Sequence, residues 1–346
     1  MNHPAEAIRH PWEAPPAPGE AIEVAEGVLW LRLPLPMALD HVNVYALRES
    51  DGWTIIDTGF DSRAARAQWQ ALRDGPLGGQ PVRRVVATHH HPDHLGLAGW
   101  FQETDGTELI ATRTAWLMAR VLTLDVQERP TPAALAFLRA CGMDAERLEA
   151  RRRSRPFNFA DVVAPLAPSY RRIRAGEVLT LGGRRWRVAV GHGHAPEHAT
   201  LWEEGGELVI AGDQVLPGIS PHLGVYVTEP DADPVAEWLE SCRALMALAR
   251  PGQLVLPGHK RPFTGLAARL AMLIENHESA LARLEAFLDR PRTAPECFAT
   301  LFRREIGEAE YGLALSEAVA HLNALRHAGR AVRWTDAGGV WHWRRA

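Results

Sequence analysis

The sequence predicts a large α/β domain followed by a small domain of helices that ends in a β-hairpin. In residues 21–265, short apolar or alternating runs typical of strands are mixed with segments of helical periodicity. Residues 113–172 interrupt this order with consecutive helical segments, and residues 266–346 run helix, helix, hairpin. With 346 residues, the chain is long enough for one large domain and a smaller one.

The first half of the large domain alternates predicted strands with predicted helices. Residues 1–20 are rich in proline and are expected to form a flexible arm. The expected strands are residues 28–35, 42–49, 53–59, 82–89 and 107–112. The expected helices are residues 62–75, where Gly75 and Pro76 end the helical pattern, and residues 95–103.

The second half begins with the helical insertion and returns to strands. Helices are expected at 114–126, 131–142 and 143–155, and the last one carries the basic run Arg151–Arg155. Two hairpins follow, at 178–192 and 199–213, each with a Gly-Gly turn. An amphipathic helix at 233–252 and a strand at 253–259 complete the domain.

The C-terminal domain has the order of a winged helix. A long helix is expected at 265–289, two shorter helices at 291–307 and 313–329, and a hairpin at 331–345. Residues 271–346 contain ten arginines and ten acidic residues. A nucleic-acid reader normally carries a basic face, so this neutral domain is expected to cover the active-site edge or to form a homodimer contact.

The overall composition is that of an ordinary globular protein. Hydrophobic residues make up 46% and charged residues 23%, and the formal net charge is −4. This balance does not favour nucleic acid or an anionic membrane. Cys141, Cys242 and Cys297 are widely spaced and odd in number, which favours free thiols in a reducing compartment. Without an export signal or a run of about 18 apolar residues, a cytoplasmic location and no membrane partner are expected.

The stretch ATHHHPDHLG, directly after a predicted strand, predicts a metal site. In a tight loop, His89 and His91 can share one metal ion, while Asp93 and His94 on the next turn can bind a second. Two ions about 3.5–4 Å apart can polarise a carbonyl or phosphoryl oxygen and supply a hydroxide nucleophile. Imidazole and carboxylate ligands suit zinc, iron or manganese.

A dinuclear site needs more ligands than this stretch provides, and three other places offer them. GHGHAPEH contains His192, His194 and His198; Asp213 follows the apolar run LVIA; and His259 follows LVL. Each lies just beyond a predicted strand, where loops commonly build sites. Taken singly, Asp213 could be a cap and His259 a loop residue; their arrival in order with the others favours a site.

These four motifs, together with WTIIDTG, resemble the metallo-β-lactamase superfamily over residues 25–265. The resemblance implies an αβ/βα sandwich with a dinuclear metal site at one edge of its two sheets. With the C-terminal winged-helix pattern, the chain is similar to the lactamase-β-like subgroup, which includes an endoribonuclease.

The resemblance also implies a role for each site residue. The first metal ion would be bound by His89, His91 and His194, the second by Asp93, His94 and His259, and Asp213 would bridge them. Zinc is favoured, with iron or manganese as alternatives. A hydroxide between the ions would be the nucleophile, and Asp93 would orient it as the catalytic residue.

Further histidines and one acid receive supporting roles. Asp57, in the DTG turn, resembles the buried acid that fixes a ligand's tautomer. His194 is preferred over His192 as the ligand, and His198 is expected to support the site or to pack. His41 and His222 follow loops that could reach the pocket, and both are predicted substrate contacts. His90 is expected to be structural.

The preferred function is a metal-dependent hydrolase of a small ester, thioester, lactone or amide. The alternative is a metal-dependent endoribonuclease acting on single-stranded RNA, favoured by the domain order and by the run Arg151–Arg155. The net charge and the neutral wing disfavour it, and residues 213–259 are too few to hold the domain that processing nucleases insert there. An iron redox enzyme, a non-enzymatic regulator and a true β-lactamase are each less consistent with the complete ligand set and the missing export signal.

Overall fold

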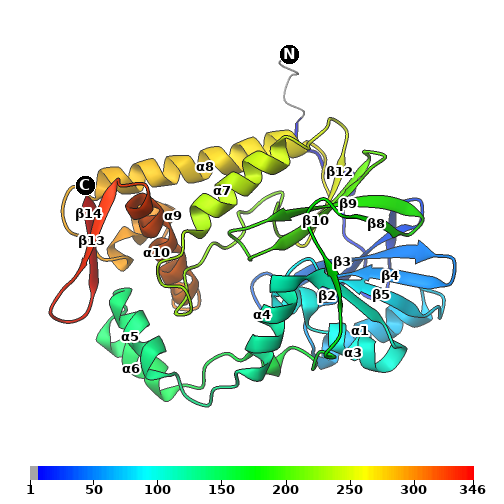
Figure 1. Ribbon diagram of the computed structural model, residues 1–346, viewed down its shortest axis with the longest axis horizontal. Coiled ribbons are helices and arrows are strands. Elements are labelled where there is room, and N and C mark those ends of the chain that lie inside the picture. The colour runs from blue at the N-terminus through cyan, green and yellow to red at the C-terminus, as the bar shows by residue number, and fades with distance from the viewer. Residues whose placement is uncertain (1–6) are drawn as a thin grey trace. The chain divides into compact units, whose positions relative to one another are not determined.

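The computed structural model describes residues 7–346, which form two compact units (Figure 1). The first unit contains the described residues up to Val126, Asn158–Pro221 and Leu245–Leu270. The second contains Gln127–Phe157, His222–Ala244 and Ala271–Ala346. The units therefore do not follow one another along the chain, and two internal segments of the sequence fold with the C-terminal residues.

The first unit is built on two β-sheets. The first sheet has seven strands in sequence order: β1 (Ile22–Ala25), β2 (Val28–Pro34), β3 (His41–Glu49), β4 (Gly52–Ile56), β5 (Val82–Val86), β6 (Glu108–Thr112) and β7 (Arg171–Ile173). The second has the order β12 (Leu254–Pro257), β11 (Leu208–Gly212), β10 (His198–Glu203), β9 (Arg184–Gly191) and β8 (Val178–Leu181). Strands β4 to β7 are parallel to one another, as are β11 and β12, and the other neighbours are antiparallel.

The two sheets pack face to face because successive side chains of a strand point to opposite faces. In β2, Trp30 joins the core between the sheets, to which Trp186 and Leu201 of the second sheet also belong. Its neighbours Leu29 and Leu31 join the core on the outer face of the first sheet. Burial on both faces explains why these strands are nearly continuous apolar runs.

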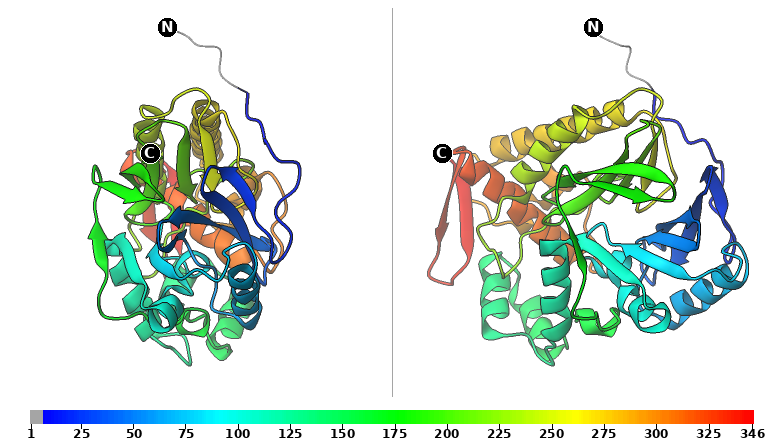
Figure 2. Two further views of the ribbon diagram at one scale, coloured as in Figure 1. Left: turned by 90° about the vertical axis from the view of Figure 1, so that its right-hand side faces the viewer. Right: turned by 45° about the vertical axis from the view of Figure 1, so that its right-hand side comes forward.

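Helices α1 (Arg63–Asp74) and α3 (Ala98–Asp105) cover the outer face of the first sheet, as Figures 1 and 2 show. Helix α1 begins where Ser62 accepts a hydrogen bond from the backbone of Ala65, an ordinary N-cap. Trp69 of α1 and Phe101 of α3 pack edge to face, with their ring centroids 4.9 Å apart. The predicted mixed α/β fold is confirmed, although strands β1 and β7 were not predicted.

The predicted insertion at 113–172 is divided between the units. Its three helices are α4 (Arg113–Leu124), α5 (Pro132–Ala140) and α6 (Ala145–Arg153). Helix α4 belongs to the first unit, where Trp116 stacks on Tyr170 at a centroid distance of 4.5 Å. Residues 127–157 belong to the second unit, and β7 begins inside the predicted insertion. Helical periodicity identifies the helices but not the unit with which each one packs.

The remaining elements include short helices and the C-terminal hairpin. They are α2 (Pro92–Leu95), η1 (Phe159–Asp161), α7 (Pro234–Met246), α8 (Leu266–Phe287), η2 (Pro295–Cys297), α9 (Phe298–Phe302), α10 (Tyr311–His327), β13 (Ala331–Thr335) and β14 (Trp341–Arg345). The helix predicted at 291–307 is shorter than expected, because Arg303 adopts a left-handed conformation with φ 57° and ends α9. No helix in the described part of the chain is long and apolar enough to cross a membrane.

Candidate metal centre

Seven side chains of metal-binding type meet beyond the ends of strands in the first unit. His89 and His91 follow β5, and Asp93 and His94 lie on the short helix α2. His194 lies between β9 and β10, Asp213 follows β11, and His259 follows β12. Within the described residues, the groups able to hold a metal are His89–His91–His194, His89–His94–Asp213 and Asp93–His94–His259.

The first group consists of three imidazoles with their nitrogens in close approach. His89 Nε2 lies 2.9 Å from His91 Nδ1 and 3.3 Å from His194 Nε2. Because Zn–N bonds measure about 2.0–2.1 Å and zinc sites are tetrahedral, two nitrogens on one zinc ion are about 3.3 Å apart. Burial, followed by the neighbouring His94, holds the pKa of His89 well below its usual value. Burial also holds the pKa of His91 well below its usual value, so His89 and His91 are neutral, which is the form that binds a metal.

The second group, as named from here on, contains Asp93, His94, Asp213 and His259, and so combines two carboxylates with two imidazoles. Asp93 Oδ2 lies 3.3 Å from His259 Nε2 and 3.6 Å from His94 Nε2. Asp213 Oδ2 lies 3.1 Å from His259 Nε2, 3.4 Å from His94 Nε2 and 3.6 Å from His194 Nε2. One oxygen of Asp213 thus lies close to nitrogens of both groups.

Two buried atoms show that this cluster fits metal cations. His94 Nε2 and Asp213 Oδ1 are buried without a hydrogen-bond partner. Buried polar groups normally have partners, so each such exception needs an explanation. Burial alone would lower the pKa of His259, but Asp213 and Asp93 outweigh it and raise the pKa to about 10. A divalent cation held by these residues would supply positive charge beside the two carboxylates, in place of the proton on His259.

Asp57 fixes the orientation of the His94 ring through the ring nitrogen that does not face the cluster. Its Oδ2 accepts a hydrogen bond from His94 Nδ1 over 2.7 Å, and Thr88 donates its backbone N–H and its hydroxyl to the same carboxylate over 2.8 Å each. Asp57 itself has φ 62°, a conformation that aspartate tolerates better than most residues. With the proton on Nδ1, the Nε2 lone pair of His94 faces the cluster.

His41 supports the site through its backbone, a role that the sequence did not suggest. Its carbonyl oxygen lies 2.7 Å from Nδ1 of His259 and accepts the proton there, which directs Nε2 toward Asp213 and Asp93. The His41 ring contacts Asp40 Oδ1 at 2.6 Å and accepts the backbone N–H of Lys260 at 3.0 Å. Both ring nitrogens thus have protein partners, and the predicted role of His41 as a substrate contact stays a prediction. No local pattern signals a carbonyl that supports a ligand 218 residues away.

His198 holds Asp213 in place. Its Nε2 accepts the backbone N–H of Asp213 over 3.1 Å, and its ring stacks on His89 with the centroids 4.5 Å apart. The fully buried ring therefore uses its Nε2 lone pair on the backbone, and that atom is not available to a metal.

Gly258 allows the loops after β11 and β12 to approach each other. A Cβ atom at this position would lie 2.2 Å from Asp213 Oδ1 and 2.7 Å from His94 Cε1. Only glycine leaves this space, so the glycine before His259 is part of the site. The glycine is visible in the sequence as part of the PGH motif, but the reason that this position must be glycine is visible only in the tertiary structure.

The other predicted residues lie outside the metal-binding groups. His192 Nδ1 accepts the backbone N–H of Glu197 at 3.4 Å, and the groups contain His194 instead. His90 is buried, and burial lowers its pKa to about 4. His222 belongs to the second unit, where its ring nitrogens lie 3.2 Å from Glu317 Oε2 and 3.3 Å from Ser316 Oγ. Its role as a substrate contact stays a prediction.

A sandwich of two sheets with clustered histidines and aspartates at the strand ends defines a class of metal-dependent hydrolases. The chain belongs to the metallo-beta-lactamase superfamily, whose sequence model matches residues 37–259. A second model, for the metallo-beta-lactamase-like C-terminal domain, matches residues 281–346. The protein is therefore a hydrolase of this superfamily with an additional C-terminal domain.

Known relatives and solved structures agree with this assignment. The probable metallo-hydrolase YqjP of Bacillus subtilis is 29% identical over 87% of this chain and 92% of its own length. Acyl-coenzyme A thioesterase MBLAC2 of Gallus gallus is 28% identical over 74% of this chain and 85% of its own. The crystal structure of a beta-lactamase domain protein from Burkholderia ambifaria covers 98% of both chains with 38% identity and a TM-score of 0.89.

Proposed function

We propose that this hydrolase uses two divalent metal ions, with zinc favoured over iron or manganese, to hydrolyse small-molecule thioesters. Within the predicted set of esters, thioesters, lactones and amides, the thioester is supported by the similarity to MBLAC2 of Gallus gallus, an acyl-coenzyme A thioesterase. Coenzyme A thioesters are therefore the proposed substrate class.

The position of Asp213 carries the dinuclear proposal. Its Oδ2 lies within 3.6 Å of His194 Nε2 from the first group and at 3.1 Å from His259 Nε2 of the second. A single carboxylate oxygen shared by two ligand groups is the arrangement that a pair of closely spaced ions needs. Bound there, two divalent cations would polarise the substrate carbonyl and lower the pKa of water.

Asp93 is the proposed acceptor of the proton from the attacking water. Its side chain is 17% exposed, against 8% for Asp213 and 0% for His94, so solvent reaches Asp93 most readily. Burial alone would raise its pKa, but the adjacent His94 and His259 lower it, which keeps the carboxylate ionised. Water adds to the thioester carbonyl as its proton passes to Asp93. The C–S bond then breaks, and the thiolate leaves with that proton as a thiol.

Two residues hold the rings in the geometry that this reaction needs. Asp57 accepts the Nδ1 proton of His94, and the carbonyl of His41 accepts that of His259. Each ring is thereby fixed as one tautomer with its Nε2 toward Asp213, which avoids a rearrangement on binding.

The alternative, an endoribonuclease, receives less support from the basic run on α6. Arg152 and Arg153 both pair with Glu149, and Arg155 pairs with Glu128. Much of the positive charge that would attract RNA is thus neutralised within the protein.

A substrate panel tests the proposal. The metal-loaded protein is incubated with an acyl-coenzyme A, an acyl-N-acetylcysteamine thioester, a lactone and single-stranded RNA, with Asp93→Asn as the blank. We expect both thioesters to be hydrolysed and the blank to lose nearly all activity. Cleavage of RNA without thioester turnover would replace the proposal by the endoribonuclease.

A further inference from the structure

The turn that carries His259 is bonded to strand β3 of the other sheet. Asn43 and Tyr45 lie two positions apart on β3, so their side chains leave the strand on the same face. The Tyr45 hydroxyl donates to the carbonyl of Pro257 over 2.9 Å, and the backbone N–H of Asn43 donates to the carbonyl of Gly258 over 2.7 Å. Strand β3 of the first sheet thus holds the residues with which the chain leaves β12 of the second.

Both polar atoms of the Asn43 side chain are used in this contact. Its Nδ2 donates to the carbonyl of Pro257 over 2.9 Å and to that of Lys260 over 2.7 Å. Its Oδ1 accepts the indole N–H of Trp30 over 2.9 Å. The Asn43 side chain is buried, so the two carbonyls would lose their partner without gaining water if the amide were removed.

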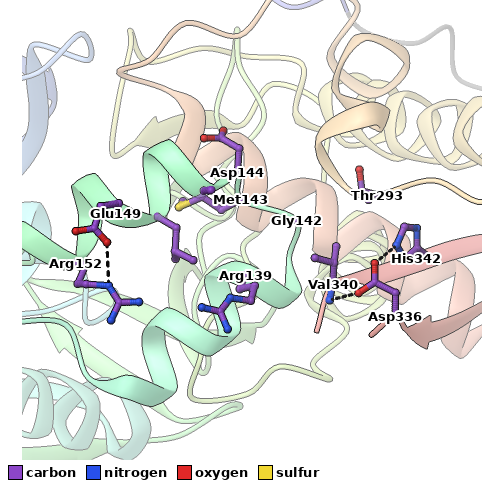
Figure 3. Close-up of a pocket in the computed structure, with 12 residues that line it drawn as sticks. Arg139, Gly142, Met143, Asp144, Glu149, Arg152, Thr293, Asp336, Val340 and His342 are labelled. Atoms are coloured by element: carbon purple, nitrogen blue, oxygen red, sulfur yellow. Dashed lines mark hydrogen bonds and ion pairs between the residues drawn. The ribbon is translucent and has the colours of Figure 1, made fainter. Parts of the chain in front are cut away.

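Polar pairs in the pocket of the second unit differ in this respect (Figure 3). The pocket measures ≈ 630 Å³, and in its wall Arg152 pairs with Glu149 and Asp336 contacts His342. These four side chains are between 25% and 52% exposed. Exposed pairs contribute little to stability, because water can replace either partner. The contacts of Asn43 are buried and have no such replacement.

Lys260, the residue after His259, has a left-handed backbone with φ 68°. In this conformation the Cβ atom crowds the following carbonyl oxygen, a cost that glycine does not have. The Lys260 N–H donates to His41 Nε2 over 3.0 Å, and its carbonyl accepts from Asn43 Nδ2 and from Arg32 Nη2 over 3.3 Å. Partners at both backbone groups therefore hold a conformation that a lysine does not prefer.

The same turn determines where the His259 ring lies. His259 Nδ1 donates to the carbonyl of His41, and Nε2 lies 3.1 Å from Asp213 Oδ2. If the backbone of Lys260 relaxed to an ordinary negative φ, the chain next to His259 would rotate and carry the ring away from Asp213. The left-handed residue and the metal centre are thus coupled through one peptide unit.

We propose that Asn43 is a positioning residue of the metal centre: it holds Lys260 in the left-handed conformation and thereby keeps His259 in place for the second metal ion. Asn43 is not one of the metal-binding residues and acts through the backbone of the turn. The inference rests on the dinuclear centre of the proposed function, but not on the substrate class.

A suppressor experiment tests this role. Asn43→Ala removes the amide, and we expect the second zinc ion to bind about tenfold more weakly in competition with a graded chelator, the lower end of the usual effect of losing a residue that supports a ligand. Adding Lys260→Gly should restore part of this loss, because glycine adopts a left-handed backbone without being held. Adding Lys260→Ala should restore nothing, because alanine keeps the Cβ atom. The two substitutions separate the backbone of residue 260 from its side chain.

Thr54→Val is the matched control for a buried polar group of the same sheet. Thr54 is buried on β4 and donates to Glu49 Oε1 over 2.6 Å, a contact that does not involve the turn. We expect the metal-free forms of Thr54→Val and Asn43→Ala both to unfold at lower urea concentration than the wild type, and only Asn43→Ala to bind zinc more weakly. If Asn43→Ala does not fold, Asn43→Asp takes its place, because it keeps the size and an acceptor for Trp30 but has no N–H.

Two results would overturn the inference. Equal zinc affinity in Asn43→Ala and the wild type would show that the turn holds His259 without the amide. Equal affinity after adding Lys260→Gly or Lys260→Ala would make Asn43 a packing residue that does not act through the left-handed backbone.

Metal content and thioester turnover separate this inference from the proposed function. A wild type that binds one equivalent of zinc rejects the dinuclear centre, and the role of Asn43 with it. A wild type that binds two equivalents but hydrolyses no thioester rejects the proposed substrate class alone, and the zinc titrations of the variants still decide the role of Asn43.

Discussion

Asp57 and His94 are joined by a buried hydrogen bond of 2.7 Å, in which the carboxylate accepts the proton on Nδ1. The two residues are 37 positions apart in the chain and meet where the loops after β4 and β5 converge. Through this bond, a residue that does not face the metal centre determines which nitrogen of His94 does.

Replacing Asp57 with asparagine should therefore weaken metal binding. The amide of Asp57→Asn can no longer accept hydrogen bonds from both Thr88 and His94, so His94 loses the partner that fixes its tautomer. We expect a loss of 10–100-fold in affinity for the second ion, about the usual effect of removing such a partner. Metal content after dialysis against a graded chelator measures it. Asp61→Asn, at a half-buried aspartate outside the centre that pairs with Arg66, is the control. Unchanged metal content in Asp57→Asn would contradict this role.

His194 and His192 form a matched pair for testing the first ligand group. His194 Nε2 lies 3.3 Å from His89 Nε2, whereas His192 Nδ1 contacts the backbone of Glu197. We expect His194→Ala to lose most of one metal equivalent and nearly all activity, and His192→Ala to keep both. Metal analysis and thioester hydrolysis of the two variants side by side give the answer. The reverse order would move the ligand to His192.

Gly258→Ala should damage the centre without removing a ligand. The added Cβ would lie 2.2 Å from Asp213 Oδ1, so the loops after β11 and β12 must separate. Overpacking of this kind costs about 1–3 kcal/mol, and we expect a matching fall in the free energy of unfolding together with lost metal. Gly218→Ala, where a Cβ would meet nothing within 4 Å, is the control. Equal unfolding curves for both variants would show that the loops have room to move.

A chain of buried histidines should make the second unit sensitive to acid. His277 Nδ1 lies 3.2 Å from His321 Nε2, and His321 Nδ1 donates to the carbonyl of Glu317 over 2.9 Å. Burial, followed by His321, lowers the pKa of His277 to about 4.

This depressed pKa makes the folded state less stable as the pH falls. His277 stays neutral in the folded state while the unfolded chain takes up a proton near pH 6.5, so its contribution is complete above that pH and is lost as the pH falls toward 4. We expect His277 to account for roughly 2 kcal/mol of lost stability between pH 7.5 and 5. Urea unfolding at both pH values measures it, and His277→Gln should show the smaller decline. The same decline in both proteins would assign the acid sensitivity to other groups.

Much of the fold followed from patterns within short segments. The hairpin turns at Gly182–Gly183 and Gly205–Gly206 appear between β8 and β9 and between β10 and β11, as expected. Local sequence was less informative about η2 and α9, because the left-handed Arg303 divides a segment whose apolar spacing predicts one longer helix. It also did not show that residues 127–157 fold with the C-terminal residues.

The sequence by itself determined which side chains carry metal-binding chemistry and that each follows a strand. Imidazoles and carboxylates in HxHxDH and before or after apolar runs are properties of short segments, and such segments can be identified without coordinates. Only the tertiary structure decided that one oxygen of Asp213 serves both ligand groups and that the carbonyl of His41 supports His259. It also brought the Asn43 amide within 2.7 Å of the Lys260 carbonyl, 217 positions away in the chain. These relationships join residues far apart in the chain, and their distances depend on how the sheets and helices pack, which no local pattern encodes.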